Sequence, residues 1–282
     1  MKISFIADLH LDLCPEIPVI DTVAKVAQER GSDLIVIAGD ICEAPDLTEE
    51  VIKQFGRLDD CPPVLFVPGN HDLWNRDTVN WTNEYIYTRF SSNPQCLINK
   101  AFDLGGGTVI LGNVGWYDYS FGAPVYSKEA FDTMTYHDVV WHDHDFNKEW
   151  TADNQAKCAE QLKLLEDQLK IATDRMHAKQ IIAVTHMVPI REMTVPYDMR
   201  PEWERFRYFN AFVGSERLGE IYEKYPVKYA VCGHVHFRRQ LDKNGIHYIS
   251  PSLGLQEEWK LFGAADTDVR TQVEDAMVTI EV

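Results

Sequence analysis

The chain opens on Lys2-Ile3-Ser4-Phe5-Ile6-Ala7-Asp8-Leu9-His10, an apolar run that ends at two side chains able to bind a metal. Short runs of the same kind recur along the chain, each bounded by turn residues. They cover residues 34–38, 64–67, 109–111, 181–185 and 229–232. Continuous runs of this length, rich in Val and Ile, are typical of strands buried on both faces. We therefore predict a layered fold with these strands in its interior.

Helical patterns lie between the strands. Residues 18–30, 47–58, 153–174 and 215–225 carry apolar side chains every three or four positions, which is the spacing of an amphipathic helix. Segments 237–241 and 246–249 are joined through Asn244-Gly245, a typical hairpin turn. The alternation of strands and helices predicts a single domain of the α/β class over residues 1–282.

Composition excludes several classes of function. The 282 residues include 27 Lys and Arg against 44 Asp and Glu, a formal net charge of −17. A nucleic-acid binder or an anionic-membrane binder needs a basic face, so we expect neither. No apolar stretch approaches the roughly 20 residues of a membrane span, and the six cysteines form no C-x-x-C pair. These features predict a cytoplasmic protein with reduced thiols.

Five polar clusters follow five of the predicted strands. They are Asp8-Leu9-His10, Gly39-Asp40, Gly69-Asn70-His71-Asp72, His186 and Gly233-His234-Val235-His236. Loops beyond the carboxyl ends of strands are where α/β folds bind their ligands. Each cluster alone has an ordinary structural explanation, such as a turn or a buried histidine. All five together, each at a strand end, indicate a metal site.

The residue types indicate which metals. The clusters offer seven oxygen or nitrogen ligands and no thiolate: Asp8, His10, Asp40, Asn70, His186, His234 and His236. Such a set suits two transition-metal ions that share one bridging carboxylate. Two ions about 3.5–4 Å apart can clamp a phosphate and acidify a water molecule. We expect the glycines at 39, 69 and 233 to let the backbone approach the ions closely.

These clusters resemble the signature of the metallophosphoesterase (calcineurin-like phosphoesterase) superfamily, which is D-x-H, G-D, G-N-H-D/E, a distant H and G-H-x-H. All five blocks occur in order between residues 8 and 236. The resemblance implies a four-layer αββα sandwich, in which two packed mixed β-sheets are flanked by helices. It also implies a hydrolase that cleaves phosphomonoesters or phosphodiesters by attack of a metal-bridging hydroxide.

Matched position by position, the resemblance implies a role for each residue. One ion would be held by Asp8, His10, Asp40 and His236, and the other by Asp40, Asn70, His186 and His234. Asp40 and a hydroxide would bridge the two ions, for which Mn²⁺, Fe²⁺ or Fe³⁺, and Zn²⁺ all fit the ligand set. His71 would be the general acid, and Asp72 the carboxylate that orients it. His71 is also too close in sequence to Asn70 to share its metal easily, which leaves it free for proton transfer.

Differences from the motifs of other members of the superfamily narrow the choice of branch within it. Gly39-Asp40-Ile41-Cys42-Glu43 lacks the arginine of the Ser/Thr protein phosphatases, and UDP-diacylglucosamine hydrolases carry Arg where this chain has His71. We expect a small phosphoester substrate, nucleotide-like compounds included. Two alternatives stay open, namely a catalytically inactive scaffold of the same fold and a nuclease of the superfamily. The acidic charge argues against the nuclease.

Segments 113–152 and 187–213 interrupt the strand and helix order, and we predict that they form a cap over the metals. Ten aromatic residues fall between positions 116 and 150. They either stack on a planar group of the substrate or form a small core of their own. Candidate substrate contacts are Trp116, Tyr117, Arg191 and Arg238. For the stretch 141–145 (Trp-His-Asp-His-Asp), we favour an exposed polar loop over a further metal site.

Overall fold

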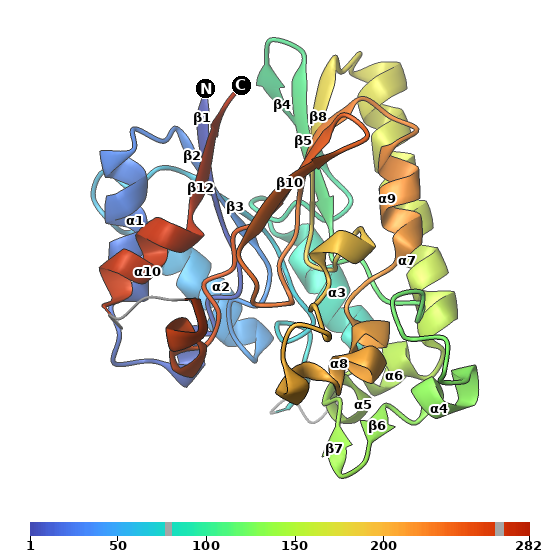
Figure 1. The fold of residues 1–282 in the computed structure, drawn as a ribbon. Helices are drawn as coiled ribbons and strands as arrows, with labels where there is room; N and C mark the ends of the chain where they lie inside the picture. The colour runs from blue at the N-terminus through green and yellow to red at the C-terminus, as the bar shows by residue number, and fades with distance from the viewer. Residues whose placement is uncertain (77–80, 263–267) are drawn as a thin grey trace.

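Two β-sheets pack face to face in this computed structural model, which describes residues 1–76, 81–262 and 268–282 (Figure 1). The first sheet has the order β12-β1-β2-β3, and the second has the order β10-β11-β9-β8-β5-β4. The strands of the first sheet are β1 (Lys2–Ile6), β2 (Leu34–Ala38), β3 (Val64–Val67) and β12 (Val278–Glu281). Those of the second are β4 (Ala101–Gly105), β5 (Thr108–Asn113), β8 (Gln180–Thr185), β9 (Val227–Val231), β10 (Arg239–Lys243) and β11 (Ile246–Ser250).

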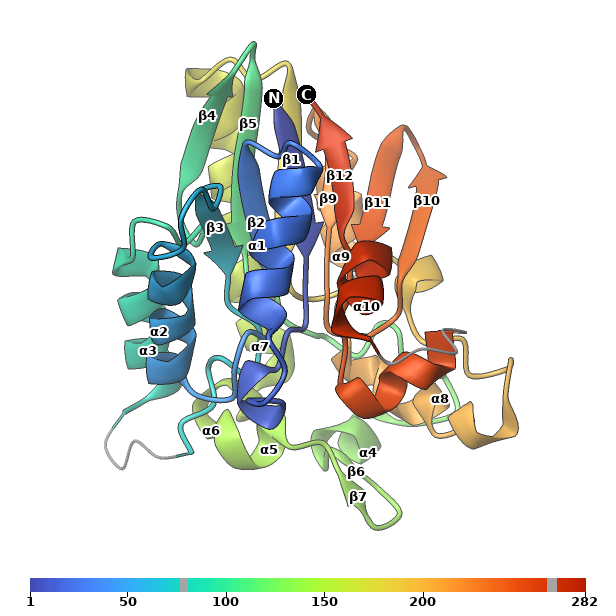
Figure 2. The same ribbon diagram turned by 90° about the vertical axis from the view of Figure 1, so that its left-hand side faces the viewer.

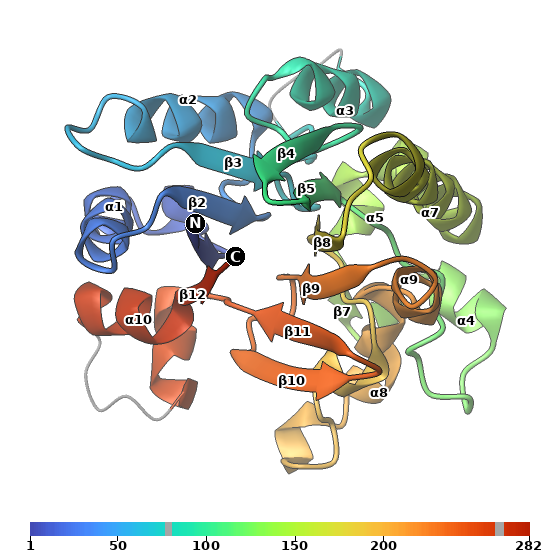
Figure 3. The same cartoon turned by 90° about the horizontal axis from the view of Figure 1, so that it is seen from above.

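Both sheets are mixed. β1, β2 and β3 run parallel, as do β5, β8, β9 and β11, while β12, β4 and β10 pair antiparallel to their neighbours. Alternate side chains of each sheet, such as Phe5 and Val36 from one and Ile182 and Ile249 from the other, form a buried core between the sheets. Seen from above, the two sheets form separate inner layers (Figure 3). This arrangement confirms the predicted pair of packed mixed sheets.

Helices cover the outer faces. α1 (Val19–Glu29), α2 (Pro45–Phe55) and α10 (Val269–Ala276) lie over the first sheet (Figure 2). α7 (Asn154–Lys170) and α9 (Glu216–Tyr222) lie over the second. α3 (Asn83–Ser92) lies beside α2, where Arg89 pairs with Asp46 and Glu49. Within the described ranges, none of the helices has the length and apolarity that crossing a membrane requires.

The predicted elements agree with the structure in the interior, but several elements at the edges of the fold were not predicted. The predicted strands at 34–38 and 64–67 coincide with β2 and β3, and the predicted helix at 153–174 is α7 followed by a π-helical turn, η2 (Ile171–Arg175). β4, β12, α3 and α10 were not predicted. β4 and β12 are edge strands whose side chains are mostly half-buried. Their sequences therefore lack the continuous apolar runs that mark buried strands.

Two long connections meet at the end of the molecule opposite the termini (Figure 1). The connection after β5 contains α4 (Lys128–Asp132), β6 (Thr135–Tyr136), β7 (Val139–Val140), α5 (Asp143–Phe146) and α6 (Lys148–Thr151). The connection after β8 contains η3 (Arg191–Met193), η4 (Pro201–Trp203), α8 (Phe206–Phe209) and η5 (Asn210–Phe212). They pack on each other, because Tyr208 Oη donates to Ala130 O at 2.6 Å and the Trp141 ring stacks on Phe209 and Phe212.

Candidate metal centre

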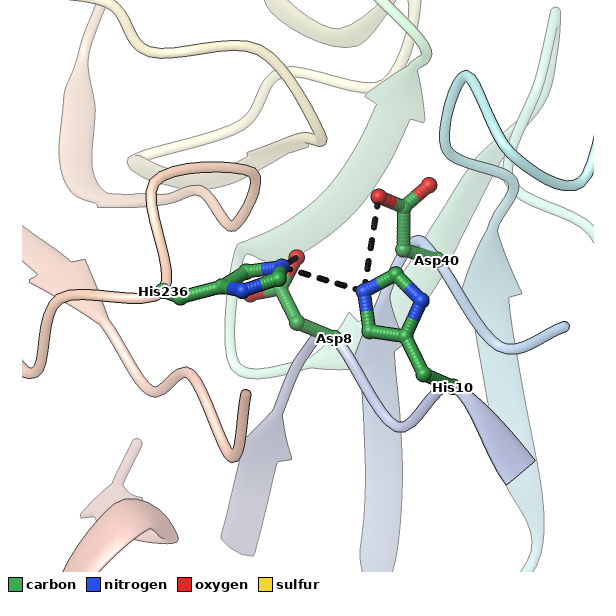
Figure 4. A group of neighbouring side chains, drawn as sticks. All are labelled: Asp8, His10, Asp40 and His236. Carbon is green, nitrogen blue, oxygen red and sulfur yellow. Dashed lines mark hydrogen bonds and ion pairs between the residues drawn. The ribbon is translucent and has the colours of Figure 1, made fainter. Parts of the chain in front are cut away.

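The five polar clusters converge where their strands end. Asp8, His10, Asp40 and His236 bring ligand atoms to within 4.8 Å of one another (Figure 4). Asp40 also belongs to a second such group, with His186 and His234. Asn70 joins this second group, since its Oδ1 lies 3.1 Å from His186 Nε2. The structure therefore brings together all seven residues that were predicted as ligands.

The backbone turns sharply at these residues. Five of the seven have positive φ angles, which are 58° at Asp8, 43° at His10, 50° at Asp40, 75° at His234 and 50° at His236. Asp, Asn and His tolerate this left-handed region better than most residues. Such conformations cost free energy and cluster at functional sites. Here they follow the strands directly and turn the side chains toward one point.

The glycines of the clusters lie in close contact with the ligand side chains or with neighbouring backbone. We expected them to let the backbone approach the ions. In the structure, a Cβ at Gly39 would collide with the ring of His186, and a Cβ at Gly69 would collide with the carboxylate of Asp40. At Gly233 a Cβ would crowd Ala38 O, at 2.8 Å. The glycines are thus needed because the strand-end loops pack tightly against the converging side chains.

Asp8, His10, Asp40 and His236 form the group that reaches the solvent-exposed surface, and we call it the open group. His10 Nε2 lies 3.0 Å from His236 Nε2 and 3.8 Å from Asp40 Oδ2 (Figure 4). The other nitrogen of His236, Nδ1, donates to Glu258 Oε2 at 2.7 Å. Asp8 Oδ1 accepts from the backbone N–H of His234 at 2.8 Å. Its Oδ2 is buried, and within the described residues no hydrogen bond reaches it.

The other group, Asp40, Asn70, His186 and His234, is the closed group. His186 is fully buried, and its Nε2 lies 3.1 Å from His234 Nδ1 and 3.2 Å from Asp40 Oδ2. Its Nδ1 donates to Ala38 O at 2.9 Å, and His234 Nε2 donates to Phe212 O at 3.2 Å. These backbone carbonyls fix the ring tautomers, so His186 Nε2 and His234 Nδ1 are left to bind a metal.

The ligand atoms fit a pair of transition-metal ions. In each group two imidazole nitrogens face each other, at 3.0 Å in the open group and 3.1 Å in the closed group. Carboxylate oxygens lie beside both pairs, and the buried Asp8 Oδ2 has no partner in the described chain. In the metal-free protein a hydrogen bond joins the two nitrogens of each pair, and a bound cation would take the place of its proton. The all-N/O set suits Mn, Fe or Zn.

In each group, one histidine ring holds a proton and the other is neutral. Burial lowers the pKa of His186, but Asp40 and Asp8 outweigh it and raise that pKa to about 9. Burial likewise lowers the pKa of His236, and Glu258 and Asp8 raise it to about 9. Burial holds the pKa of His10 and of His234 well below the usual value, so these rings are neutral. The metal-free protein therefore holds one imidazolium in each group, beside the carboxylates of Asp8, Asp40 and Glu258.

His71 lies beside the shared carboxylate. Its Nε2 is 3.9 Å from Asp40 Oδ2, and its backbone N–H donates to Asp40 Oδ1 at 3.0 Å. Its ring stacks on Trp74 with centroids 3.7 Å apart, and its Nδ1 lies 3.3 Å from Glu43 Oε1. Burial lowers the pKa of His71, but Asp40 and Glu43 outweigh it and raise that pKa. His71 is therefore poised to hold a proton at the edge of the centre.

Asp72 has a different role from the one predicted. We expected it to orient His71, but in the described part of the chain no hydrogen bond joins the two side chains. The buried carboxylate of Asp72 accepts from Thr48 and from the backbone N–H groups of Ile41, Cys42 and Gly69. It thus ties two strand-end loops together. The partner of His71 is Glu43, which the sequence analysis missed although it follows Asp40 by three residues.

Asp143 is another residue that the sequence analysis misjudged. We expected residues 141–145 to form an exposed polar loop, and the side chains of His142 and His144 are indeed 63 % and 53 % exposed. Asp143 is fully buried, and its carboxylate accepts five hydrogen bonds. The donors are Asn70 Nδ2, Trp74 Nε1, Tyr117 Oη, Trp141 Nε1 and Asn147 Nδ2. Asp143 thereby turns the amide nitrogen of Asn70 away from the centre and leaves its Oδ1 facing His186.

The residues predicted as substrate contacts all interact with other parts of the protein. Trp116 and Tyr117 are fully buried and stack on each other, so neither ring can stack on a substrate. They form part of a core of the aromatic segment, the second of the two explanations considered. Arg191 donates to Glu216 and to Ser120 O. Arg238 donates to Ser252 O, Leu253 O and Gln272.

Comparisons with known proteins agree with this geometry. The family model described as calcineurin-like phosphoesterase matches residues 1–238. The chain is 24 % identical over 276 residues to the acyl-carrier-protein phosphodiesterase PptH of Mycobacterium tuberculosis, covering 90 % of this chain and 78 % of the relative. The crystal structure of phosphopantetheinyl hydrolase PptH from the same organism superposes with a TM-score of 0.71 at 20 % identity, covering 95 % and 94 % of the two chains. A dimetal phosphatase from Danio rerio gives 0.50 at 15 % identity, covering 89 % and 86 %.

Proposed function

The chain belongs to the calcineurin-like phosphoesterase family and is a metal-dependent phosphoester hydrolase, and on this premise we propose that it cleaves phosphodiesters at a centre of two metal ions. The observation that carries the proposal is the pair of ligand groups that share Asp40. Asp8, His10 and His236 complete one set of ligands, and Asn70, His186 and His234 complete the other. When bound, two such ions supply positive charge for the phosphoryl oxygens and lower the pKa of a water molecule.

The side chains of this protein then handle the leaving group. We assign His71 as the general acid, because Asp40 and Glu43 raise its pKa and so favour the protonated ring. Glu43 holds Nδ1, Trp74 supports the ring face, and Nε2 stays on the side of Asp40. From this position Nε2 donates its proton to the leaving oxygen, which departs as an alcohol. Arg76 pairs with Glu43 and keeps that carboxylate in place.

Two features support a diester over a monoester. The relative PptH is named a phosphodiesterase. In this chain, two pockets also flank the open group. One is about 310 Å³ and is lined by Leu9, His10, Leu13, Cys14 and residues 254–257. The other is about 80 Å³ and includes His236 and Glu258. A diester has an alcohol arm on each side of its phosphorus, so each arm has a pocket to enter.

The test begins with metal-stripped protein and add-back of Mn, Fe or Zn. We expect two ions per chain by elemental analysis, and faster hydrolysis of bis(p-nitrophenyl) phosphate than of p-nitrophenyl phosphate. A preference for the monoester would overturn the diester assignment, and an Asp40→Asn variant with unchanged turnover would overturn the centre itself. Phosphopantetheine-bearing acyl carrier protein is the first natural substrate to try, with release of the arm followed by mass spectrometry.

We also propose a cytoplasmic location. All six cysteines are free thiols in the structure, and four of them are buried. Unpaired thiols are the normal state of a reducing compartment. Fractionation of source cells with an antibody against the chain tests this, and recovery from an extracytoplasmic fraction would contradict it.

A further inference from the structure

The pocket beside His236 is lined by aromatic rings that the metal centre does not use. Its lining residues are Val195, Trp203, Phe206, Val235, His236, Phe237 and Glu258. The rings of Trp203, Phe206 and Phe237 are half-buried, unlike the fully buried Trp116 and Tyr117. Partly exposed aromatic rings around a concave site are a common lining of ligand pockets. Because His236 belongs to the open group, the pocket adjoins the proposed reaction centre.

An arginine guanidinium group lies against each of the three rings. Arg200 lies 4.8 Å from the Trp203 ring centroid, Arg205 lies 5.3 Å from that of Phe206, and Arg239 lies 5.8 Å from that of Phe237. Among the side chains that the structure describes, none of these three arginines takes part in a salt bridge. No described carboxylate is paired with them, although the chain as a whole carries −17. These guanidinium groups place positive charge beside the rings, in a pocket whose lining also includes the carboxylate of Glu258.

On the basis of the proposed function, we propose that this pocket is the subsite for one alcohol arm of the phosphodiester, and that the arm is apolar or aromatic. A phosphoryl group held at the centre would lie next to His236, and one of its arms could then enter the pocket that His236 and Glu258 line together with the rings. Aromatic rings supply stacking and apolar contact to such an arm. The three arginines attract the negative charge of the diester to this side of the centre.

The experiment uses two phosphodiesters with the same leaving group, methyl p-nitrophenyl phosphate and phenyl p-nitrophenyl phosphate. The measured quantity is the ratio of kcat/KM for the phenyl arm to kcat/KM for the methyl arm. We expect this ratio to fall by about 10-fold in Trp203→Ala, and also to fall in Phe206→Ala, because each removes a ring that contacts the arm.

Trp81→Ala is the matched control. Trp81 is also half-buried with a guanidinium 4.6 Å from its ring centroid, that of Arg89, and it is not among the pocket's lining residues.

The outcomes separate this inference from the proposed function. If the wild-type metalloprotein hydrolyses neither diester, the proposed function fails. If it hydrolyses both, and Trp203→Ala and Phe206→Ala keep the wild-type ratio, the subsite is wrong while the function stands. A control Trp81→Ala that lowers the ratio equally would also overturn the subsite, because the effect would then be general.

A second experiment tests the arginines. Exchanging Arg200 and Arg205 for Gln should lower kcat/KM for both diesters and weaken the dependence of kcat/KM on salt. An unchanged salt dependence would remove the arginines from the proposal.

Discussion

The two halves of the metal centre are supported in different ways. In the closed group, His186 is wholly buried, and its ring and that of His234 are held by backbone carbonyls. In the open group, the side chain of His236 is 18 % exposed, and it is held by Glu258, whose side chain is 29 % exposed. A backbone carbonyl is a neutral acceptor, whereas Glu258 carries a charged and partly exposed carboxylate. We therefore propose that the closed group retains its ion and that the open group contacts substrate.

The surroundings of the two groups extend this difference. The closed group is backed by Asp143, whose five donors connect Asn70 to the aromatic segment. The open group is flanked by both pockets, since His10 lines one and His236 lines the other. We therefore expect variants in the two halves to have separable effects on metal binding and on turnover.

The largest effects should come from removing a ligand of either half. His186→Asn and His236→Asn should each lower turnover of a diester by about 10⁴-fold, because a metal ion provides several kcal/mol of transition-state stabilisation. Elemental analysis should show that His186→Asn loses one ion and retains the other in the open group. His144→Asn, at an exposed histidine, is the control. Loss of both ions from His236→Asn would break the comparison, because the closed group could not then hold its ion alone.

Removing the proposed acid should have the next largest effect. His71→Ala should lower turnover of an alkyl diester by about 10²- to 10³-fold, because its poor leaving group needs a proton. The loss should be much smaller with a p-nitrophenolate leaving group, which departs without protonation. Both halves should keep their ions. An equal loss with the two leaving groups would contradict the acid role and place His71 in binding.

Most of the ligand set could be predicted from sequence because each ligand directly follows a buried strand. The strands fix where the loops begin, and parallel strands bring their carboxyl ends to one edge, so short local motifs were enough for Asp8, Asp40 and His186. The supporting residues could not be found in this way. Glu258 lies 22 residues from His236, and Asp143 lies 73 residues from Asn70. Their partnership exists only after folding.

Aromatic density also misled the sequence analysis, for a physical reason. In the sequence, Trp116 and Tyr117 cannot be told apart from Trp203 and Phe206, because large aromatic rings occur both in cores and in binding pockets. Burial separates the two sets, and burial depends on contacts between the connections after β5 and β8. Asp143 shows the converse error. An acidic residue among polar neighbours resembles a surface loop, and only the five donors around it explain why it is buried.

Two conservative variants should sharpen the comparison with a smaller effect. Asp143→Asn should weaken the closed-group ion by about 10- to 100-fold, and Glu258→Gln should weaken the open-group ion by a similar factor, because each carboxylate orients a ligand. Calorimetric titration of the metal-free protein measures both affinities. The double variant Asn70→Asp with Asp143→Asn restores an amide–carboxylate pair with the roles exchanged, so it should recover closed-group affinity. Failure of that rescue would reduce Asp143 to a packing role.

The smallest expected effect is on the pH dependence of metal affinity. In the metal-free protein, the pKa of His186 and that of His236 are raised to about 9, so both rings are protonated at neutral pH. Each ion must displace one proton, since a metal binds the neutral ring. Affinity in each half should therefore rise about tenfold per pH unit and level off above about pH 9. Glu258→Gln removes the main group that raises the pKa of His236, so the levelling in the open half should move to lower pH while that of the closed half stays. Titrations in buffers of different ionisation enthalpy count the protons released, and a count of zero at pH 7 would contradict the imidazolium pattern in both halves.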